Sequence, residues 1–297
     1  MHYLITGGTG FIGTALIEAL LAEGHSATVL SRQRLSDTAA LRYVADLQEV
    51  TDEAHIDVVV NLAGASLAGA RWTEGYKQEI LSSRLGTTGK VIALIERLNR
   101  KPRLLLSASA IGYYGHHGDE LLGEDGAVEP GFSATLCQQW ESAAEAAAEQ
   151  GVRVCLLRLG VVLDRNGGAM EEMARPFKFG IANWLGSGHQ WLSWVHRRDV
   201  VAAIRFLRDR PDLAGAFNIT APEPVTSRGF CSAMKRYKRT LLTAPVPAPV
   251  MRLLVGEMAE ELLLNGQRVV PGRLAAAGFQ FGYANLDAAL EDILQGS

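Results

Sequence analysis

The sequence predicts an α/β fold, a doubly wound parallel sheet with a smaller C-terminal substrate-side α/β region. Two observations carry this prediction. Strand-like and helix-like segments alternate up to about residue 160, which is typical of βαβ units. Beyond that point glycine and proline interrupt shorter segments. We therefore expect one domain over residues 1–160 and a mixed domain over residues 161–297, with some of its segments returning to the main sheet.

The first domain alternates short apolar strands with helices of 3.6-residue periodicity. Strands are expected at His2–Thr6, Ala27–Leu30, Leu41–Val44, Ile56–Asn61, Arg103–Ser107 and Val152–Leu157. Helices are expected at Thr14–Glu23, Thr73–Asn99 and Phe132–Gln150, each followed by a glycine or proline stop signal. In the second domain, helices are expected at Arg197–Arg208, Arg228–Lys238, Ala248–Leu264 and Leu286–Leu294, and strands near 192–195 and 216–219 that rejoin the main sheet.

Composition excludes several classes of partner. The net charge of −3 and the pI near 6.2 give no electrostatic footprint for nucleic acid or an anionic membrane, so we expect a small-molecule substrate. The three cysteines have neither disulfide nor zinc-site spacing, which predicts no metal and favours a reducing cytoplasm. The N-terminus lacks the basic start and long apolar run of a signal peptide, and no stretch is apolar enough to span a bilayer.

A glycine-rich turn follows the first expected strand and opens the first helix. In a dinucleotide-binding turn, one glycine permits the tight bend, one lets the backbone approach the pyrophosphate, and one lets helix and strand pack closely. The alternative is a plain glycine turn. Position and spacing together favour a Rossmann cofactor site, with these residues as binding candidates: Gly7, Thr9, Gly10, Phe11, Ile12 and Gly13.

The end of the second expected strand distinguishes NADP from NAD. An acidic residue about 20 residues after the glycines would bind the ribose hydroxyls of NAD. Here the sequence has Ser31-Arg32, and no Asp or Glu precedes Asp37. A hydroxyl and a guanidinium suit a 2′-phosphate, so we expect NADP(H). The alternative is an ordinary solvated arginine.

Further cofactor contacts are expected at other strand ends. Asp46-Leu47 follows the third strand, where an adenine edge could be recognised, and Leu62-Ala63-Gly64 follows the fourth, where small residues bring the backbone close to the cofactor. Each could equally be strand-end packing. Arg158 ends a buried strand near the expected nicotinamide edge, whereas Arg84 lies in the long helix and could also be on a solvated face.

These motifs resemble the extended short-chain dehydrogenase/reductases, and the resemblance runs through the whole chain. The glycine turn is similar to that family's TGxxGxxG, and Ser107-Ala108-Ser109-Ala110 before Tyr114-Gly115 is similar to its SSSAxxYG strand end. The resemblance implies that Ser109 is the catalytic serine and that Ser107 faces the cofactor. Arg71-Trp72, Ser83-Arg84, Gly112–Gly115, Trp140-Glu141 and Pro271–Leu274 resemble an atypical subgroup, the epimerase family proteins of short-chain reductase group 39U, which are similar to NAD-dependent epimerases/dehydratases.

The family's catalytic Tyr-x-x-x-Lys pair is missing. None of the seven tyrosines is followed by lysine four positions later, and no lysine occurs between Lys101 and Lys178. Phe132 and Leu136 occupy the expected positions. Without the ammonium that lowers a tyrosine pKa from near 10, the standard proton transfer is strongly disfavoured.

Three residues remain as catalytic candidates. We expect Ser109 to hydrogen-bond a carbonyl, and Tyr113 or Tyr114 to be a substitute acid, although both rings could simply build a pocket wall. The pair His116-His117 is expected to be exposed. Two functions remain open: an NADP-dependent reductase or epimerase-like oxidoreductase acting on a small carbonyl or alcohol, and a non-catalytic NADP(H)-binding redox sensor or regulatory protein. The wider family implies a homodimer through the two long helices, although the subgroup could equally be monomeric.

Overall fold

The computed structural model describes residues 1–165 and 167–295. Its main sheet has seven parallel strands in the order β12-β7-β5-β4-β1-β2-β3. Their bounds are β1 His2–Thr6, β2 Ser26–Leu30, β3 Leu41–Val44, β4 Val58–Asn61, β5 Leu104–Ala110, β7 Arg153–Leu159 and β12 Gly215–Ile219. The chain direction across the sheet reverses between β1 and β4, where such folds bind ligands at the carboxyl ends of the strands. The predicted Rossmann fold is confirmed.

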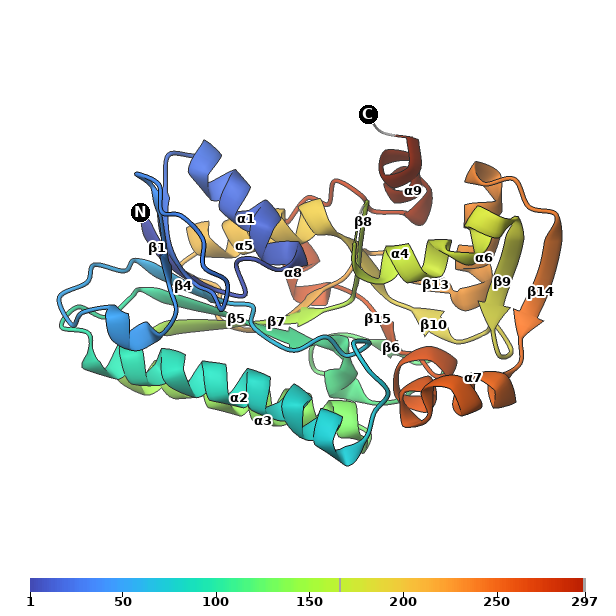
Figure 1. Ribbon diagram of the computed structural model, residues 1–297, viewed down its shortest axis with the longest axis horizontal. Coiled ribbons are helices and arrows are strands. Elements are labelled where there is room, and N and C mark those ends of the chain that lie inside the picture. The colour runs from blue at the N-terminus through green and yellow to red at the C-terminus, as the bar shows by residue number, and fades with distance from the viewer. Residues whose placement is uncertain (166, 296–297) are drawn as a thin grey trace.

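Helices cover both faces of this sheet (Figure 1). One face carries α1 (Phe11–Ala22), α5 (Arg197–Asp209) and the short α8 (Gly272–Ala276). The other carries α2 (Glu74–Arg97), α3 (Phe132–Glu145) and the 3₁₀ turn η3 (Ala146–Gln150) that continues α3. Because both faces are buried, the strands are apolar at nearly every position, as the sequence indicated.

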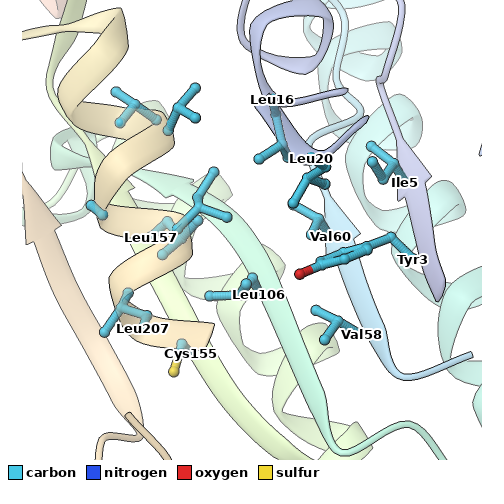
Figure 2. Packing of buried hydrophobic residues seen from close by; sticks show 14 of the residues in the cluster. Tyr3, Ile5, Leu16, Leu20, Val58, Val60, Leu106, Cys155, Leu157 and Leu207 are labelled. Carbon is cyan, nitrogen blue, oxygen red and sulfur yellow. The ribbon is translucent and has the colours of Figure 1, made fainter. Parts of the chain in front are cut away.

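The core alternates along each strand. Figure 2 shows Tyr3, Ile5, Val58 and Val60 from the sheet pointing towards the side chains of Leu16 and Leu20 on α1. The intervening residues contribute to the core on the α2 and α3 side, among them Leu4, Val59, Leu105 and Leu156. This period of two follows from the pleat of the strand.

The second region is built from small two-stranded sheets. Its strand pairs are β8 (Val161–Asp164) with β11 (Trp194–His196), β9 (Ile181–Leu185) with β14 (Leu242–Val246), β10 (Trp191–Leu192) with β13 (Val225–Thr226), and β6 (Leu121–Leu122) with β15 (Arg268–Val269). Its helices are α4 (Gly168–Ala174), α6 (Ser227–Tyr237), α7 (Ala248–Val255) and α9 (Leu286–Gln295). Its short 3₁₀ helix η4 (Pro176–Phe179) and π-helix η5 (Ala259–Leu264) complete this region, whereas the short helices η1 (Leu47–Glu49) and η2 (Ile111–Tyr114) follow β3 and β5 of the main sheet. No helix in the described ranges is long and apolar enough to cross a membrane.

Two expectations for this region were wrong, whereas the helices expected at 197–208, 228–238 and 286–294 are confirmed as α5, α6 and α9. The segment near 216–219 joins the main sheet as β12, as predicted. The segment near 192–195 does not, because Gly160 brings the chain close to Ser193 and β11 pairs with β8 outside the main sheet. The helix expected at 248–264 is broken after Val255, where Gly256 adopts a φ of +65°.

Candidate functional site

The glycine turn after β1 is too crowded for larger residues. Gly7 has a φ of +67°, and a Cβ there would lie 2.7 Å from the carbonyl carbon of Leu62. A Cβ on Gly13 would lie 2.6 Å from Gly8 Cα and closer still to Gly7 O. The Gly10 N–H donates to Gly7 O at 3.0 Å and closes the turn. Glycine at these positions therefore allows the start of α1 to pack closely against the end of β1 and the loop after β4.

The first turn of α1 offers free backbone donors. Its N-cap, Gly10, is extended and provides no side-chain cap. Thr9 and Gly10 are exposed, and Phe11 and Ile12 are half-buried. The first N–H groups of a helix have no intrahelical acceptor, and the helix dipole favours an anion beside them. This end of α1 can therefore hold a phosphate group.

Phe11 connects the turn to the second region. A Cβ on Gly167 would lie 2.9 Å from the Phe11 ring, and one on Gly168 would lie 2.7 Å from it. The Arg197 guanidinium lies 4.7 Å from the ring centroid and donates to Phe11 O at 3.1 Å. The two regions thus meet directly at the candidate cofactor turn.

The end of β2 leaves a cation exposed. Ser31 is buried, and its Oγ accepts from the Gln33 N–H at 3.0 Å. Arg32 is exposed and has no ion pair among the described residues. Asp37, the nearest acidic residue, instead accepts from the Tyr43 N–H at 2.8 Å. This strand end therefore presents a guanidinium where a ribose-binding carboxylate would stand in an NAD site.

Asp46 and Leu47 stand at the end of β3. Asp46 caps η1 by accepting from the Gln48 N–H at 3.0 Å, and it pairs with Lys90 at 2.7 Å. The hydrogen bond from Lys90 is the main cause of the lowered pKa of Asp46. Leu47 is buried in the core.

A row of polar side chains crosses the sheet at the carboxyl end of β4. Thr6 donates to Asn61 Oδ1 at 2.6 Å, and the Asn61 amide donates to Ser107 Oγ at 3.1 Å and to Thr88 Oγ1 at 2.9 Å. Thr6 Oγ1 also accepts from the Ala63 N–H at 3.2 Å. These bonds fix the Leu62-Ala63-Gly64 loop against the glycine turn, and they place the Ser107 hydroxyl in a buried network.

Arg84 is a buried cation without a carboxylate partner in the described part of the chain. It is only 8% exposed, and its Nη1 donates to the carbonyl oxygens of Ala65 and Ile80, both at 3.1 Å. Its guanidinium lies against Gly64 and 5.1 Å from the Trp140 ring. Burial lowers the pKa of Arg84. Because an uncompensated buried charge is costly, this position suits an anionic ligand.

A second polar row lies one step further along the sheet. Ser109 on β5 pairs in register with Arg158 on β7, which pairs with Asn218 on β12. Glu141 of α3 lies over this row. Arg158 donates from Nε to Glu141 Oε1 at 2.8 Å and from Nη2 to Oε2 at 2.9 Å, and Ser109 donates to Oε1 at 2.6 Å. Ser109, Glu141 and Arg158 are each 5% exposed or less, and Asn218 is fully buried.

The hydroxyl proton of Ser109 points to Glu141. A serine hydroxyl has one proton and two lone pairs, so this oxygen is an acceptor towards any further partner. The donation from Ser109 to a carbonyl stays a prediction, which would require this proton to turn away from Glu141. A ligand hydroxyl fits it better.

Arg158 and Tyr114 are held inside the protein. Besides Glu141, Arg158 Nη1 donates to Tyr114 Oη and to Glu124 O, both at 3.0 Å. Burial alone would lower the pKa of Arg158, but the hydrogen bonds and charge of Glu141 outweigh it and raise that pKa. Arg158 is therefore the fixed partner of Glu141, and its assignment as a cofactor ligand stays a prediction.

The two tyrosines differ in accessibility. Tyr114 is fully buried and donates to Asn218 Oδ1 at 2.7 Å, and burial raises its pKa. It is a structural member of this network, which corrects its prediction as a substitute acid. Tyr113 is half-buried, with its ring centroid 3.4 Å from the Arg158 guanidinium carbon. Only Tyr113 keeps a hydroxyl with no hydrogen bond to a described residue.

The face of α3 that meets β5 begins one residue after the expected Tyr position, Phe132. Phe132 and Leu136 pack with Trp72 in a separate apolar cluster. Ser133 and Cys137 lie beside Gly112, which follows Ser109 along the chain. Ser133, Cys137 and Glu141, spaced i, i+4 and i+8, therefore occupy the face where a Tyr/Lys pair was sought. Burial raises the pKa of the Cys137 thiol to about 11, so it is not a reactive thiolate.

The prediction of an exposed histidine pair was wrong. Both His116 and His117 are partly buried, and His117 bonds to Glu120 at 2.9 Å and to Tyr114 O at 2.9 Å. Within the described ranges, no three His, Cys, Asp or Glu side chains are grouped as metal ligands.

Sequence reasoning missed Glu141, Ser133 and Glu124 as site residues. Glu124 accepts from the Asn218 N–H at 3.0 Å and thereby anchors the second polar row. The available signal for Ser133 and Glu141 was their spacing of eight residues, which places both on one face of the expected helix. In the sequence, the Trp140-Glu141 pair indicates only a resemblance to the subgroup.

Two family models match the chain. The NAD dependent epimerase/dehydratase family matches residues 3–220, and a domain of unknown function, DUF1731, matches residues 246–293. An epimerase family protein of Staphylococcus haemolyticus is 39% identical over 300 residues, which is 99% of each chain. The epimerase family protein YfhF of Bacillus subtilis is 37% identical over 300 residues, covering 99% of this chain and 98% of its own.

Solved structures give the same picture. Human epimerase family protein SDR39U1, solved with NADPH, superposes with a TM-score of 0.91 at 32% identity over 100% of both chains. A nucleoside-diphosphate sugar epimerase of Corynebacterium glutamicum gives a TM-score of 0.76 at 27% identity, over 99% of this chain and 58% of that one. MoeE5 in complex with UDP-glucuronic acid and NAD shares the fold, with a TM-score of 0.80 at 22% identity over 100% of this chain and 98% of that one.

Proposed function

The chain belongs to the NAD dependent epimerase/dehydratase family, and from this premise we propose that it is an NADP(H)-dependent oxidoreductase acting on a small alcohol or carbonyl compound. The observation that carries the proposal is Arg32 at the end of β2, which has no ion pair within residues 1–165 and 167–295 and lies beside a turn whose glycines leave room for a pyrophosphate. The similar human protein was solved with NADPH, which supports this choice of cofactor.

The residues fit a dinucleotide. The N–H groups of Thr9, Phe11, Ile12 and Gly13 would hold the diphosphate at the start of α1, where Gly7 permits the bend and Gly10 lets the backbone approach closely. A Cβ at Gly7 or Gly13 would fill this cradle. When bound, the nicotinamide ring supplies or accepts a hydride.

The remaining contacts follow the sheet edge. Ser31 and Arg32 would bind the 2′-phosphate, and Asp46 with Leu47 would border the adenine. The Leu62-Ala63-Gly64 backbone and Ser107 would lie along the nicotinamide half. Arg84, which lacks an internal counter-ion among the described residues, would balance a cofactor or substrate anion.

Ser109 and Glu141 would move the proton. An alcohol bound at Ser109 donates to its Oγ, and a proton taken from that alcohol passes through Ser109 to Glu141 Oε1, 2.6 Å away. Arg158 is a positioning residue that holds both Glu141 oxygens. Tyr113 would close the site and is the alternative proton donor.

A regulatory NADP(H)-binding protein is the second candidate function. It is favoured by the absence of the Tyr/Lys pair, because a positioned acid/base typically contributes about 10²–10⁴ in rate. Three buried free thiols, Cys137, Cys155 and Cys231, support a cytoplasmic location for either function. The homodimer through α2 and α3 stays a prediction.

Titration with NADPH and NADH tests the cofactor. Loss of one charge-assisted contact is typically worth about 1.5–3 kcal/mol, so Arg32→Ala should weaken NADPH binding about 10–150-fold and leave NADH unchanged. Arg239→Ala, an exposed arginine in the second region, is the control. Equal NADPH affinity in wild type and Arg32→Ala would refute the 2′-phosphate assignment.

Turnover separates the two functions. The protein is assayed with NADP⁺ and NADPH against a panel of alcohols, aldehydes, ketones and nucleotide sugars. We expect turnover of at least one class, reduced about 10²-fold or more in Ser109→Ala. Tight NADPH binding without turnover of any class would favour the regulatory function.

A further inference from the structure

The paired strands β9 and β14 carry large apolar side chains in water. They lie at the right-hand end of the molecule in Figure 1, away from the first strand, with Ile181 opposite Leu242 in register. The N–H groups of Leu241 and Leu242 donate to Gly180 O at 2.7 and 3.2 Å, which joins the two strand starts. Exposure is high at Phe179 (74%), Leu241 (82%) and Leu242 (57%), and Ile181 is 37% exposed. Neighbouring apolar side chains left in water mark an interaction surface.

Cations without counter-ions stand beside these apolar side chains. The stretch 224–256 contains six Lys and Arg residues and no Asp or Glu, although the whole chain has a net charge of −3. Two cations near the strand starts, Arg175 and Arg236, are paired with acidic residues. Four others form no ion pair with a described residue and are at least partly exposed: Lys178, Lys235, Lys238 and Arg239. The net charge, which indicated no footprint for an anionic membrane, therefore conceals a local one.

This combination of charge and apolar surface selects one kind of partner. Nucleic acid binding is driven by phosphate neutralisation, which needs cations but no exposed leucines. A stable protein interface takes about 20–30 residues a side, far more than the two strand starts present. A bilayer surface offers anionic headgroups above acyl chains, and it accepts cations and a few apolar side chains together.

We propose that residues 178–181 and 235–242, here called the basic apolar patch, dock on an anionic lipid surface. Phe179, Leu241 and Leu242 enter the boundary between headgroups and acyl chains, and the unpaired cations contact the headgroups. The contact is peripheral and needs no membrane-spanning helix. It lies outside the cofactor turn, so it does not depend on the proposed function.

Vesicle co-sedimentation without cofactor tests the docking. Wild type should bind vesicles of equal parts phosphatidylglycerol and phosphatidylcholine, should not bind pure phosphatidylcholine, and should dissociate as salt is raised. Arg239→Gln should lower the partition coefficient about fivefold, the factor for one cation near an anionic leaflet, and Leu241→Ser should lower it about tenfold. Both residues are exposed, so the melting temperature should not change. Arg100→Gln, an exposed cation before β5, is the matched control and should bind as wild type does.

A fluorescent label reports whether the apolar side chains enter the lipid. The three native cysteines are buried, so a label on Leu241→Cys is selective. Its emission should shift to shorter wavelength with anionic vesicles, whereas the same label on Thr51→Cys, an exposed position beyond β3, should not shift.

Four results would overturn the lipid-docking surface. They are no binding of wild type to anionic vesicles, equal binding to pure phosphatidylcholine, full binding by Leu241→Ser, and an unshifted label at position 241. Tighter binding of a DNA duplex than of vesicles, equal in wild type and Leu241→Ser, would also overturn it and assign the patch to nucleic acid.

Discussion

Replacing Gly13 with alanine tests whether the turn geometry serves ligand binding. The added Cβ would lie 2.6 Å from Gly8 Cα, whereas carbon atoms in contact stay about 3.5–4.0 Å apart, so the turn must move by about 1 Å. Overpacking of this kind lowers the folding stability by about 1–3 kcal/mol, whereas the higher helix propensity of alanine raises it by up to about 1 kcal/mol. The net loss of folding stability should therefore stay below about 3 kcal/mol.

We expect Gly13→Ala to reduce NADPH affinity by a larger free energy than it reduces folding stability. A displacement of about 1 Å removes at least one charge-assisted hydrogen bond to the diphosphate, which is worth about 1.5–3 kcal/mol, or about 10–150-fold in Kd. NADPH fluorescence titration measures the Kd, and urea unfolding measures the stability.

The matched control is Gly86→Ala. It lies in the exposed middle of α2 with no atom within 4 Å of the added Cβ. It should stabilise the protein by about 0.5–1 kcal/mol and leave the Kd unchanged. NADPH affinity of Gly13→Ala within twofold of wild type would refute the assignment of this turn.

Other perturbations address the core, the buried ion pair and pH. Leu106→Ala, at a fully buried sheet position, should lower the free energy of unfolding by about 2–5 kcal/mol in urea titration; a loss below 1 kcal/mol would contradict the packing. Arg158→Leu should lower the free energy of unfolding by about 3–5 kcal/mol because it leaves the buried Glu141 carboxylate without its counter-ion. Adding Glu141→Leu should recover most of that loss, and failure to recover it would show that the two charges are not coupled. Burial lowers the pKa of His196 below its usual 6.5, so the unfolded chain takes up a proton first and stability should fall as the pH drops below about 6.5, by at most about 1.4 kcal/mol per pH unit. His196→Asn, which can still accept from the Arg198 N–H, should flatten this dependence in urea titrations at pH 7.5 and 5.5; an unchanged slope would exclude His196 as the cause.

The strands were predictable because both faces of the sheet are covered. In apolar runs such as Val58–Val60 every side chain is buried. The spacing of the glycines in the turn after β1 directly indicates a dinucleotide-binding turn. The segment near 192–195 was not predictable, since its pairing depends on where Gly160 turns the chain out of the sheet.

The site was less predictable because its partners are distant in sequence. Ser109 and Glu141 are 32 residues apart, and no local pattern records their contact. The face of α3 that meets β5 is hard to predict because a shift of one residue rotates a helix face by about 100°. Packing against Trp72 and the cap from Glu261, which accepts from the Phe132 and Ser133 N–H groups, set that rotation, and both come from elsewhere in the chain.

The capping of α3 by Glu261 also bears on how the protein is synthesised. The acceptor leaves the ribosome 129 residues after the helix start that it completes, and Leu274 and Phe279 enter the core between α1, α5 and the sheet later still. The Rossmann half therefore lacks these contacts until the segment matched by DUF1731 has been synthesised. That segment is therefore part of the same core and not a separate module. Cutting the gene at the boundary between the two family models would leave both pieces without residues that complete their packing.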